Sequence, residues 1–216
     1  MKNIIFIAPP AAGKGTMSEV LIEKYGYKHV STGNILRRMA KSKDEFGKEL
    51  STLLSSGQLV PDTIVYEAVK RRLSEKDLDN GFILDGFPRN IEQAKEYDKI
   101  LEELGKDHGV VIYLDTPRDI LEKRIVGRRI CPKCGATFNV LTGVNTPKKE
   151  NICDKCGEEL YQREDDNIES FNTRYDTFLE KTYPLIEFYE KKNILYRVKS
   201  VDVVNTMKEI EAIIND

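Results

Sequence analysis

Apolar runs alternate along this chain with longer stretches in which apolar positions recur at helical spacing. The apolar runs predict strands at residues 3–8, 27–30, 81–85, 110–115 and 194–198. The stretches between them predict helices near residues 14–25, 33–41, 44–55, 62–75, 90–105, 117–129, 166–191 and 203–214. Strands that alternate with helices are typical of β-α units that build a parallel sheet. The pattern therefore predicts an α/β fold in which helices flank a five-stranded parallel sheet.

Two segments depart from this alternation. Residues 130–163 have the composition of strands and turns and no helical period, which indicates an inserted module. Residues 32–61 predict two short helices where a crossover between strands needs only one. We therefore expect a core made of residues 1–31, 62–129 and 164–216 that carries two insertions.

Composition and charge exclude several classes of protein. Lys and Arg number 34 and Asp and Glu number 36, so the net charge of -2 gives no general reason to bind nucleic acid or an acidic membrane. The N-terminus lacks the features of a signal peptide, and no later window approaches the roughly 20 apolar residues of a membrane span. We expect a cytoplasmic protein that binds neither nucleic acid nor membrane.

The four cysteines are the strongest local signal in residues 130–163. Cys131, Cys134, Cys153 and Cys156 have the spacing C-x2-C-x18-C-x2-C, which is typical of structural zinc sites with four thiolate ligands. A disulfide pair is the alternative, and a reducing compartment disfavours it. A nucleic-acid-binding zinc ribbon is a second alternative, which the acidic balance of the chain disfavours.

A candidate phosphate-binding loop, "PPAAGKGT" at residues 9–16, lies between the first strand and the first helix. In the general pattern G-x-x-x-x-G-K-[ST], successive backbone N–H groups surround an anion and a lysine reaches the outer phosphates. Gly13 and Lys14 match, whereas Ala8 replaces the first glycine and Gly15 replaces the hydroxyl residue. The alternative is an ordinary strand-to-helix turn with an exposed Lys14.

Four further motifs help to interpret this candidate phosphate-binding loop. "STGNILRR" (31–38), "GQLVPD" (57–62), "ILDGFPR" (83–89) and "RIVGRR" (124–129) follow it in order. Together the five motifs resemble the adenylate kinase family, nucleoside monophosphate kinases of the P-loop class, in its long-lid form. That family's loop reads G-x-P-G-x-G-K-G-T, so Gly15 and Thr16 are expected, while Ala8 and Ala11 remain departures.

The resemblance implies reversible phosphoryl transfer from MgATP to AMP, giving two ADP, by a monomer with Mg²⁺ on the nucleotide and a structural Zn²⁺. It implies a P-loop core, an AMP-binding insertion at 32–61 and a zinc-binding lid at 130–163. The implied ATP-binding residues are Ala11, Ala12, Gly13, Lys14, Gly15, Thr16, Arg124 and Arg128. The implied AMP-binding residues are Thr32, Gly33, Arg37, Leu54, Gln58, Leu59, Val60, Gly86, Arg89, Gln93, Arg163 and Arg174. The implied catalytic residues are Lys14, Asp85, Arg89, Arg124, Arg128, Arg163 and Arg174.

Two rival functions stay open at this point. Another nucleoside monophosphate kinase would use a different acceptor, although Thr32 and Gln93 match the positions that read adenine in the resembled family. A nucleotide-binding relative with impaired catalysis would explain the departures from the family pattern. Those departures are Ala8, Ala11, Asn34 and Val203.

Overall fold

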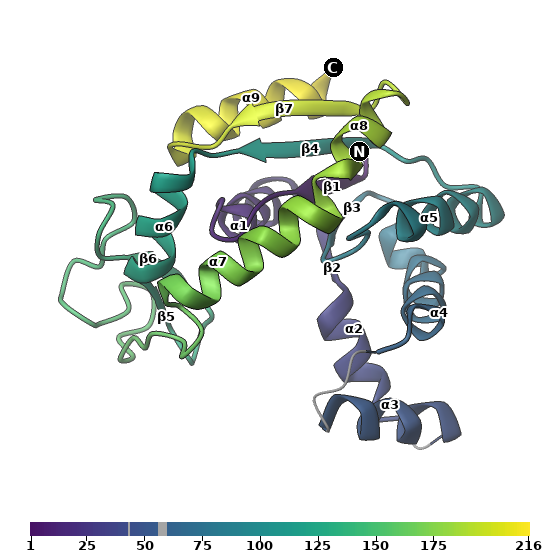
Figure 1. The fold of residues 1–216 in the computed structure, drawn as a ribbon, viewed down its shortest axis with the longest axis horizontal. Coiled ribbons are helices and arrows are strands. Elements are labelled where there is room, and N and C mark those ends of the chain that lie inside the picture. The colour runs from purple at the N-terminus through teal and green to yellow at the C-terminus, as the bar shows by residue number, and fades with distance from the viewer. Residues whose placement is uncertain (43, 56–59) are drawn as a thin grey trace. The chain divides into compact units, whose positions relative to one another are not determined.

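The strands of the computed structural model, which describes residues 1–42, 44–55 and 60–216, form one five-stranded sheet. Its order is β2-β3-β1-β4-β7 (Figure 1). The bounds are Ile4–Ile7 for β1, Lys28–Ser31 for β2, Phe82–Asp85 for β3, Val110–Asp115 for β4 and Leu195–Lys199 for β7. β3 pairs in parallel with both β1 and β2, with Ile4 opposite Ile83 and Val30 opposite Leu84. The predicted five-stranded parallel sheet is confirmed.

The helices follow the predicted positions closely. Their bounds are α1 Lys14–Tyr25, α2 Thr32–Met39, α3 Glu45–Ser55, α4 Asp62–Leu73, α5 Ile91–Leu104, α6 Arg118–Gly127, α7 Ile168–Thr177, α8 Pro184–Glu190 and α9 Val203–Asn215. Asn90, Asn167 and Asp202 cap α5, α7 and α9, because each side chain accepts a hydrogen bond from the backbone N–H three residues later. None of the described helices has the length and apolar character that a membrane crossing requires.

The expected helix over residues 166–191 is interrupted. A π-helical turn, Phe178–Thr182, separates α7 from α8, and the N–H of Tyr183 donates to the carbonyl of Phe178 at 2.8 Å. Pro184 explains the interruption, because proline has no N–H to donate and its ring clashes with the carbonyl four residues earlier. A π turn widens the helix at this point and lets the chain continue.

The described chain divides into two compact units. The first comprises Met1–Ile7, Ser18–Ile112 and Pro184–Tyr196. Its core is apolar, and all four residues of β1 are buried, as are Phe82, Ile83 and Leu84 of β3. Burial of one such side chain contributes about 1.5–3 kcal/mol. Continuous apolar runs are what a strand covered on both faces requires, which is why these strands could be predicted.

The second unit comprises Ala8–Met17, Tyr113–Tyr183 and Arg197–Asp216. Within this unit, residues 130–163 are hereafter called the cysteine module. Strand β5 (Arg128–Ile130) leads into the module and pairs antiparallel with β6 (Thr137–Asn139) inside it. The module has a small core of its own, formed by Cys131, Ala136, Phe138, Cys153 and Leu160. The expected strand-and-turn character of this segment is confirmed.

Candidate functional site

Residues 8–13, hereafter the phosphate loop, connect β1 to α1 through a tight turn. The N–H of Ala12 donates to the carbonyl of Pro9 at 3.3 Å, which closes a four-residue turn. Pro10 occupies the second position, and Ala11 occupies the third with φ +65°. Proline followed by a positive φ is the signature of a type II turn, in which the third residue is normally glycine.

The structure separates the two unusual alanines of the loop. Positive φ among the described non-glycine residues is found at Ala11, Asn145, Asn151 and Asn193, and Ala8 is not among them. The left-handed conformation costs an alanine roughly 1–2 kcal/mol, so the strain of the loop belongs to Ala11. Sequence reasoning left both positions open. Pro10 was the available signal, because proline favours the second position of such a turn.

The N-terminus of α1 directly follows the loop. The first i→i−4 bond of the helix runs from the N–H of Met17 to the carbonyl of Gly13 at 3.0 Å, so the N–H groups of Lys14, Gly15 and Thr16 precede the helical ladder. Such groups, with the positive end of the helix dipole, form a site for anions. Gly13 has φ +97°, which favours glycine, and it matches the expected pattern.

Arg124 of α6 contacts this loop. One guanidinium nitrogen donates to the carbonyl of Ala12 at 3.2 Å, and the other terminal nitrogen donates to the carbonyl of Val201 at 2.7 Å. Burial lowers the pKa of Arg124 below its ordinary value. The prediction that Arg124 belongs with the phosphate loop is thus consistent with its position, and its present partners are backbone carbonyls.

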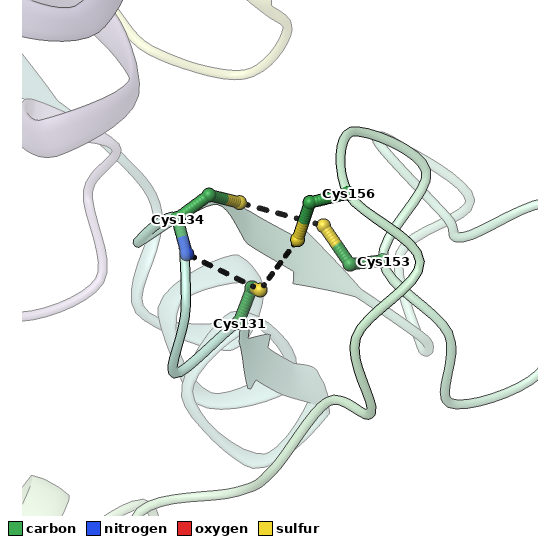
Figure 2. A group of neighbouring side chains, drawn as sticks. All are labelled: Cys131, Cys134, Cys153 and Cys156. Carbon is green, nitrogen blue, oxygen red and sulfur yellow. Dashed lines mark hydrogen bonds between the residues drawn. The ribbon is translucent and has the colours of Figure 1, made fainter.

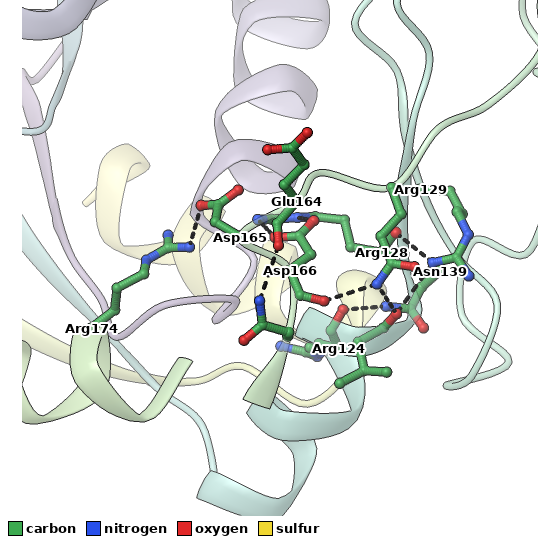
Figure 3. A network of polar contacts seen from close by, with 11 residues as sticks. Arg124, Arg128, Arg129, Asn139, Glu164, Asp165, Asp166 and Arg174 are labelled. Atoms are coloured by element: carbon green, nitrogen blue, oxygen red, sulfur yellow. Dashed lines mark hydrogen bonds and ion pairs between the residues drawn. The ribbon is translucent and has the colours of Figure 1, made fainter. Parts of the chain in front are cut away.

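Two adjacent aspartates hold two other predicted arginines (Figure 3). Arg128 forms a bidentate pair with Asp166, whose side chain is fully buried, with Nε donating to Oδ2 at 2.8 Å and Nη2 donating to Oδ1. Arg174 donates to Asp165 at 3.1 Å in a pair that is exposed on both sides. Arg163, two residues before Asp165, is exposed. Sequence reasoning missed both aspartates, although "REDD" at 163–166 was a visible signal.

In the first unit, predicted residues gather where β2 and β3 end. Thr32 donates through Oγ1 to the carbonyl of Asp85 at 3.1 Å, across the register that sets Ser31 opposite Asp85. The carboxylate of Asp85 has His29 Nε2 at 3.3 Å from Oδ2. Sequence reasoning did not include His29, whose place two residues before the end of β2 was the only clue. Parallel strands with these ends side by side bring Thr32 and Asp85 together.

Gly86 and Arg89 form a compact turn after β3. Nε of Arg89 donates to the carbonyl of Gly86 at 2.9 Å. Gly86 has φ +82°, and a Cβ there would lie 3.3 Å from Nη2 of Arg89 and 3.7 Å from Oγ1 of Thr32. The positive φ therefore favours glycine, and a Cβ would in addition make the guanidinium of Arg89 shift slightly.

Gln93 is buried and its amide already joins two neighbours. Oε1 accepts from the backbone N–H of Arg89 at 2.8 Å, and Nε2 donates to Asp62 Oδ1 at 2.8 Å. An amide has two donors and two lone pairs, so one of each is left for a further partner. Val60 is partly buried and Gly33 lies in α2. Predicted residues Gln58 and Leu59, and the side chains of Arg37 and Leu54, lie outside what the structure describes.

The four cysteines come together as predicted (Figure 2). Their sulfur atoms all lie within 4.8 Å of one another, with Cys131 and Cys156 at 3.4 Å and Cys134 and Cys153 at 3.5 Å. All four are free, and these pairs are too far apart for a disulfide of about 2.05 Å. A tetrahedron with metal–sulfur bonds of about 2.3 Å has edges near 3.8 Å, so the cluster could hold a metal ion.

Backbone turns shape the two Cys-x-x-Cys segments alike. Gly135 donates to the carbonyl of Cys131 at 3.0 Å, and Gly157 donates to the carbonyl of Cys153 at 2.9 Å. Both glycines have φ +76°. Burial raises the pKa of the Cys131 thiol, but hydrogen bonds from the backbone N–H of Cys134 and from neighbouring groups outweigh it and lower that pKa to about 6. A lowered pKa suits a metal ligand, because the ligand is the thiolate. Backbone hydrogen bonds lower the pKa values of Cys134 and Cys156, but hydrogen bonds among the sulfurs and burial outweigh them and raise both pKa values instead.

Comparison with known proteins agrees with the geometry. The family model described as "Adenylate kinase" matches residues 6–194. An adenylate kinase of Thermosipho africanus is 47% identical over 213 residues, which cover 98% of this chain and 99% of that protein. Adenylate kinases of Archaeoglobus fulgidus and Bacillus licheniformis are 46% and 43% identical, covering 98% and 94% of this chain and 97% and 93% of their own.

Proposed function

This chain belongs to the adenylate kinase family, and from that premise we propose which of its residues serve each nucleotide. The chain is an enzyme that transfers a phosphoryl group between ATP and AMP, giving two ADP. The observation that carries the assignment of residues is the turn after β1, which presents the N-terminus of α1 and Lys14 together. Phosphoryl transfer needs little covalent chemistry from the protein and depends on positioning and on cations around the transferred group.

The phosphate loop and the first turn of α1 bind the ATP phosphates. Backbone N–H groups from Gly13 to Thr16 supply neutral donors, and Lys14 supplies a charge that reaches the outer phosphates. Because the donors belong to the backbone, alanine at positions 8 and 11 removes none of them. The loop therefore keeps its binding groups, and its departures from the family pattern affect only the cost of its conformation.

Residues of the first unit bind AMP. Arg89 supplies the charge for the AMP phosphate, since a planar guanidinium can form a bidentate contact with two phosphate oxygens, and its Nε now donates to the Gly86 carbonyl. Arg37 would assist it, and Thr32, Gln93 and the backbone of residues 57–60 would read the adenine. The other residues expected to contact AMP in this unit are Gly33, Leu54 and Gly86. Gln93 is suited to a base edge because its amide retains one donor and one acceptor.

The remaining arginines neutralise charge on the transferred group. Arg124, Arg128, Arg163 and Arg174 supply positive charge, and a planar guanidinium can contact two phosphate oxygens at once. Arg128 and Arg174 are held by Asp166 and Asp165. The buried carboxylate of Asp166 orients Arg128 before nucleotide binds, whereas the exposed pair of Arg174 with Asp165 is weak. Phosphate oxygens would then share or replace the carboxylates. One chain carries every residue named for both nucleotides, so a monomer is sufficient.

Mg²⁺ would accompany ATP near Asp85. A single carboxylate at the end of β3, partly exposed, fits an ion that retains most of its waters and takes its other ligands from phosphates. The ion supplies charge neutralisation for the phosphates. The role of this chain is to orient its water shell through Asp85, whose main-chain carbonyl is held by Thr32.

The cysteine cluster would hold a structural Zn²⁺. Four sulfur ligands fill a tetrahedral site and leave no position for substrate, so the ion would stabilise the cysteine module and take no part in transfer. Because binding displaces thiol protons, affinity for the metal should fall as pH decreases.

Changing Arg89→Ala tests the acceptor assignment. Loss of a charge-assisted contact should lower kcat/KM for AMP by a factor that corresponds to about 2–5 kcal/mol of lost transition-state binding, while ATP affinity stays the same. Arg71→Ala is the matched control, because Arg71 is an exposed arginine of the same unit that pairs with Glu67 one helical turn away. Unchanged kinetics for AMP would refute the role of Arg89. Measuring transfer from ATP to each of several nucleoside monophosphates would show whether the enzyme prefers an acceptor other than AMP.

A further inference from the structure

Ser200 lies immediately after β7, and its hydroxyl contacts the phosphate loop. Oγ donates to the carbonyl of Ala12 at 2.7 Å, across 188 positions of sequence. The side chain is buried, with 2% of the residue exposed. Together with the 3.2 Å bond from Arg124, this gives the Ala12 carbonyl two donors, one for each lone pair.

The backbone of Ser200 is itself fixed. Its N–H donates to the carbonyl of Asp115, the last residue of β4, at 2.8 Å. Its carbonyl accepts from Oγ1 of Thr116 at 3.2 Å in a buried contact. The hydroxyl therefore projects from a backbone that two hydrogen bonds attach to the end of a core strand.

The Ala12 carbonyl controls the direction of one phosphate-binding donor. In a planar trans peptide the C=O of Ala12 and the N–H of Gly13 point in opposite directions. Holding the carbonyl toward Ser200 therefore aims the N–H of Gly13 away from it. Ala12 is also the last residue of the turn and directly follows Ala11, whose φ of +65° is unfavourable for alanine. Anchoring the Ala12 carbonyl therefore restrains the turn that keeps Ala11 in this conformation.

We infer that Ser200 is a positioning residue for ATP binding, which holds the Ala12–Gly13 peptide in its phosphate-binding orientation and thereby maintains the left-handed conformation of Ala11. The inference rests on the proposed role of the phosphate loop. Arg124 donates to the same carbonyl but is itself expected to contact ATP. Ser200 is uncharged and buried, and it is not expected to contact the nucleotide. Its hydroxyl can therefore keep its hydrogen bond to the Ala12 carbonyl before and after ATP binds.

The inference predicts an energetic coupling between Ser200 and Ala11. Ser200→Ala removes the hydrogen bond and should weaken ATP affinity about tenfold, the effect of one buried hydrogen bond, while AMP affinity changes less than about twofold. In an Ala11→Gly background the left-handed conformation carries no penalty for the side chain, so the same change should weaken ATP binding about threefold or less.

Thr206→Val provides the matched control. Thr206 is another buried hydroxyl of the second unit, and it donates to the carbonyls of Lys199 and Asp202 without contacting the phosphate loop. Its loss should lower thermal stability about as much as the loss of the Ser200 hydroxyl, with ATP affinity unchanged. A role for Ser200 in folding alone would make the two variants behave alike in both measurements.

Calorimetric titration of each variant with ATP, and separately with AMP, decides the matter. A loss of ATP affinity that is selective and that diminishes in the Ala11→Gly background supports the inference. Equal losses in the two backgrounds, equal losses for both nucleotides, or no loss would overturn it while the proposed function stands. If the unaltered protein fails to bind ATP, both the inference and the proposed function of the loop are wrong.

Discussion

The cysteine module and the phosphate loop both depend on turns with positive φ, but they use different residues at those turns. In the cysteine module the positions belong to Gly135 and Gly157, both at φ +76°, whereas in the phosphate loop the position belongs to Ala11 at φ +65°. A glycine turn needs no external support, and the cysteine ligands then lie in place for a metal. The alanine turn is held by hydrogen bonds to the adjacent Ala12 carbonyl. Similar backbone geometry can therefore be stabilised by residue type or by tertiary contacts.

Removal of the metal should have the largest effect. Purified protein should contain about one zinc per chain, and Cys153→Ser or a strong chelator should unfold the cysteine module, because folding of its turns is coupled to metal binding. Differential scanning calorimetry should show a large loss of thermal stability for the module and a retained transition for the sheet. Metal-free protein of unchanged stability would refute the structural role.

The buried ion pair next to the module should have the next largest effect. Asp166→Asn leaves Arg128 without its carboxylate in a mostly buried site and should cost about 3 kcal/mol in the free energy of unfolding. Asp165→Asn is the control, since its pair with Arg174 is exposed and should contribute less than about 1 kcal/mol. Urea denaturation measures both. Equal losses would mean that burial does not distinguish the two pairs.

Alanine at a cysteine turn tests the role of glycine there. Gly135→Ala meets no atom within 4 Å, so its cost of roughly 1–2 kcal/mol would come from the left-handed backbone alone. Gly143→Ala is the matched control, because Gly143 has φ +68°, equally open surroundings and no cysteine beside it. Both variants should lose stability, and only Gly135→Ala should also weaken zinc binding in competition with a chelator. Weaker zinc binding in both would assign the effect to the module as a whole.

The reverse change in the phosphate loop should have the smallest effect. Ala11→Gly relieves the strained conformation but increases the freedom of the unfolded chain, so we expect a net gain of about 0.5–1 kcal/mol in stability. Ala8→Gly has no strain to relieve and should be neutral or slightly destabilising. Chemical denaturation of the two variants provides the comparison. A larger gain from Ala8→Gly would contradict the assignment of strain to Ala11.

Local pattern was sufficient to predict the sheet and the cysteine cluster. Buried strands such as β1 appear as continuous apolar runs, and the spacing of the cysteines brings two short turns together whatever the rest of the fold does. The interruption at Phe178–Thr182 depends on Pro184, which was visible in the sequence and is known to disturb a helix. Whether the disturbance becomes a break or a π turn depends on packing, which the local sequence does not give.

Contacts between distant segments could not be predicted in the same way. The bond from Ser200 to Ala12 joins residues that only the completed fold brings together, and a single serine after a strand carries no motif. The pairing of Arg128 with Asp166, and not with the adjacent Asp165, similarly depends on which carboxylate the backbone directs inward. The sequence predicted these arginines as candidates but not the carboxylates and carbonyls that they contact.

Binding of ATP by the phosphate loop and transfer to AMP, despite the strain at Ala11, is what the rest of the proposed function depends on. It is tested most directly by measuring ADP formation from ATP, AMP and Mg²⁺, together with ATP affinity, in the unaltered protein and in the Ala8→Gly/Ala11→Gly double variant. We expect the unaltered protein to be active and the two glycines to improve ATP affinity and turnover by no more than about tenfold. No detectable binding or transfer by the unaltered protein, restored a thousandfold or more by the two glycines, would contradict it.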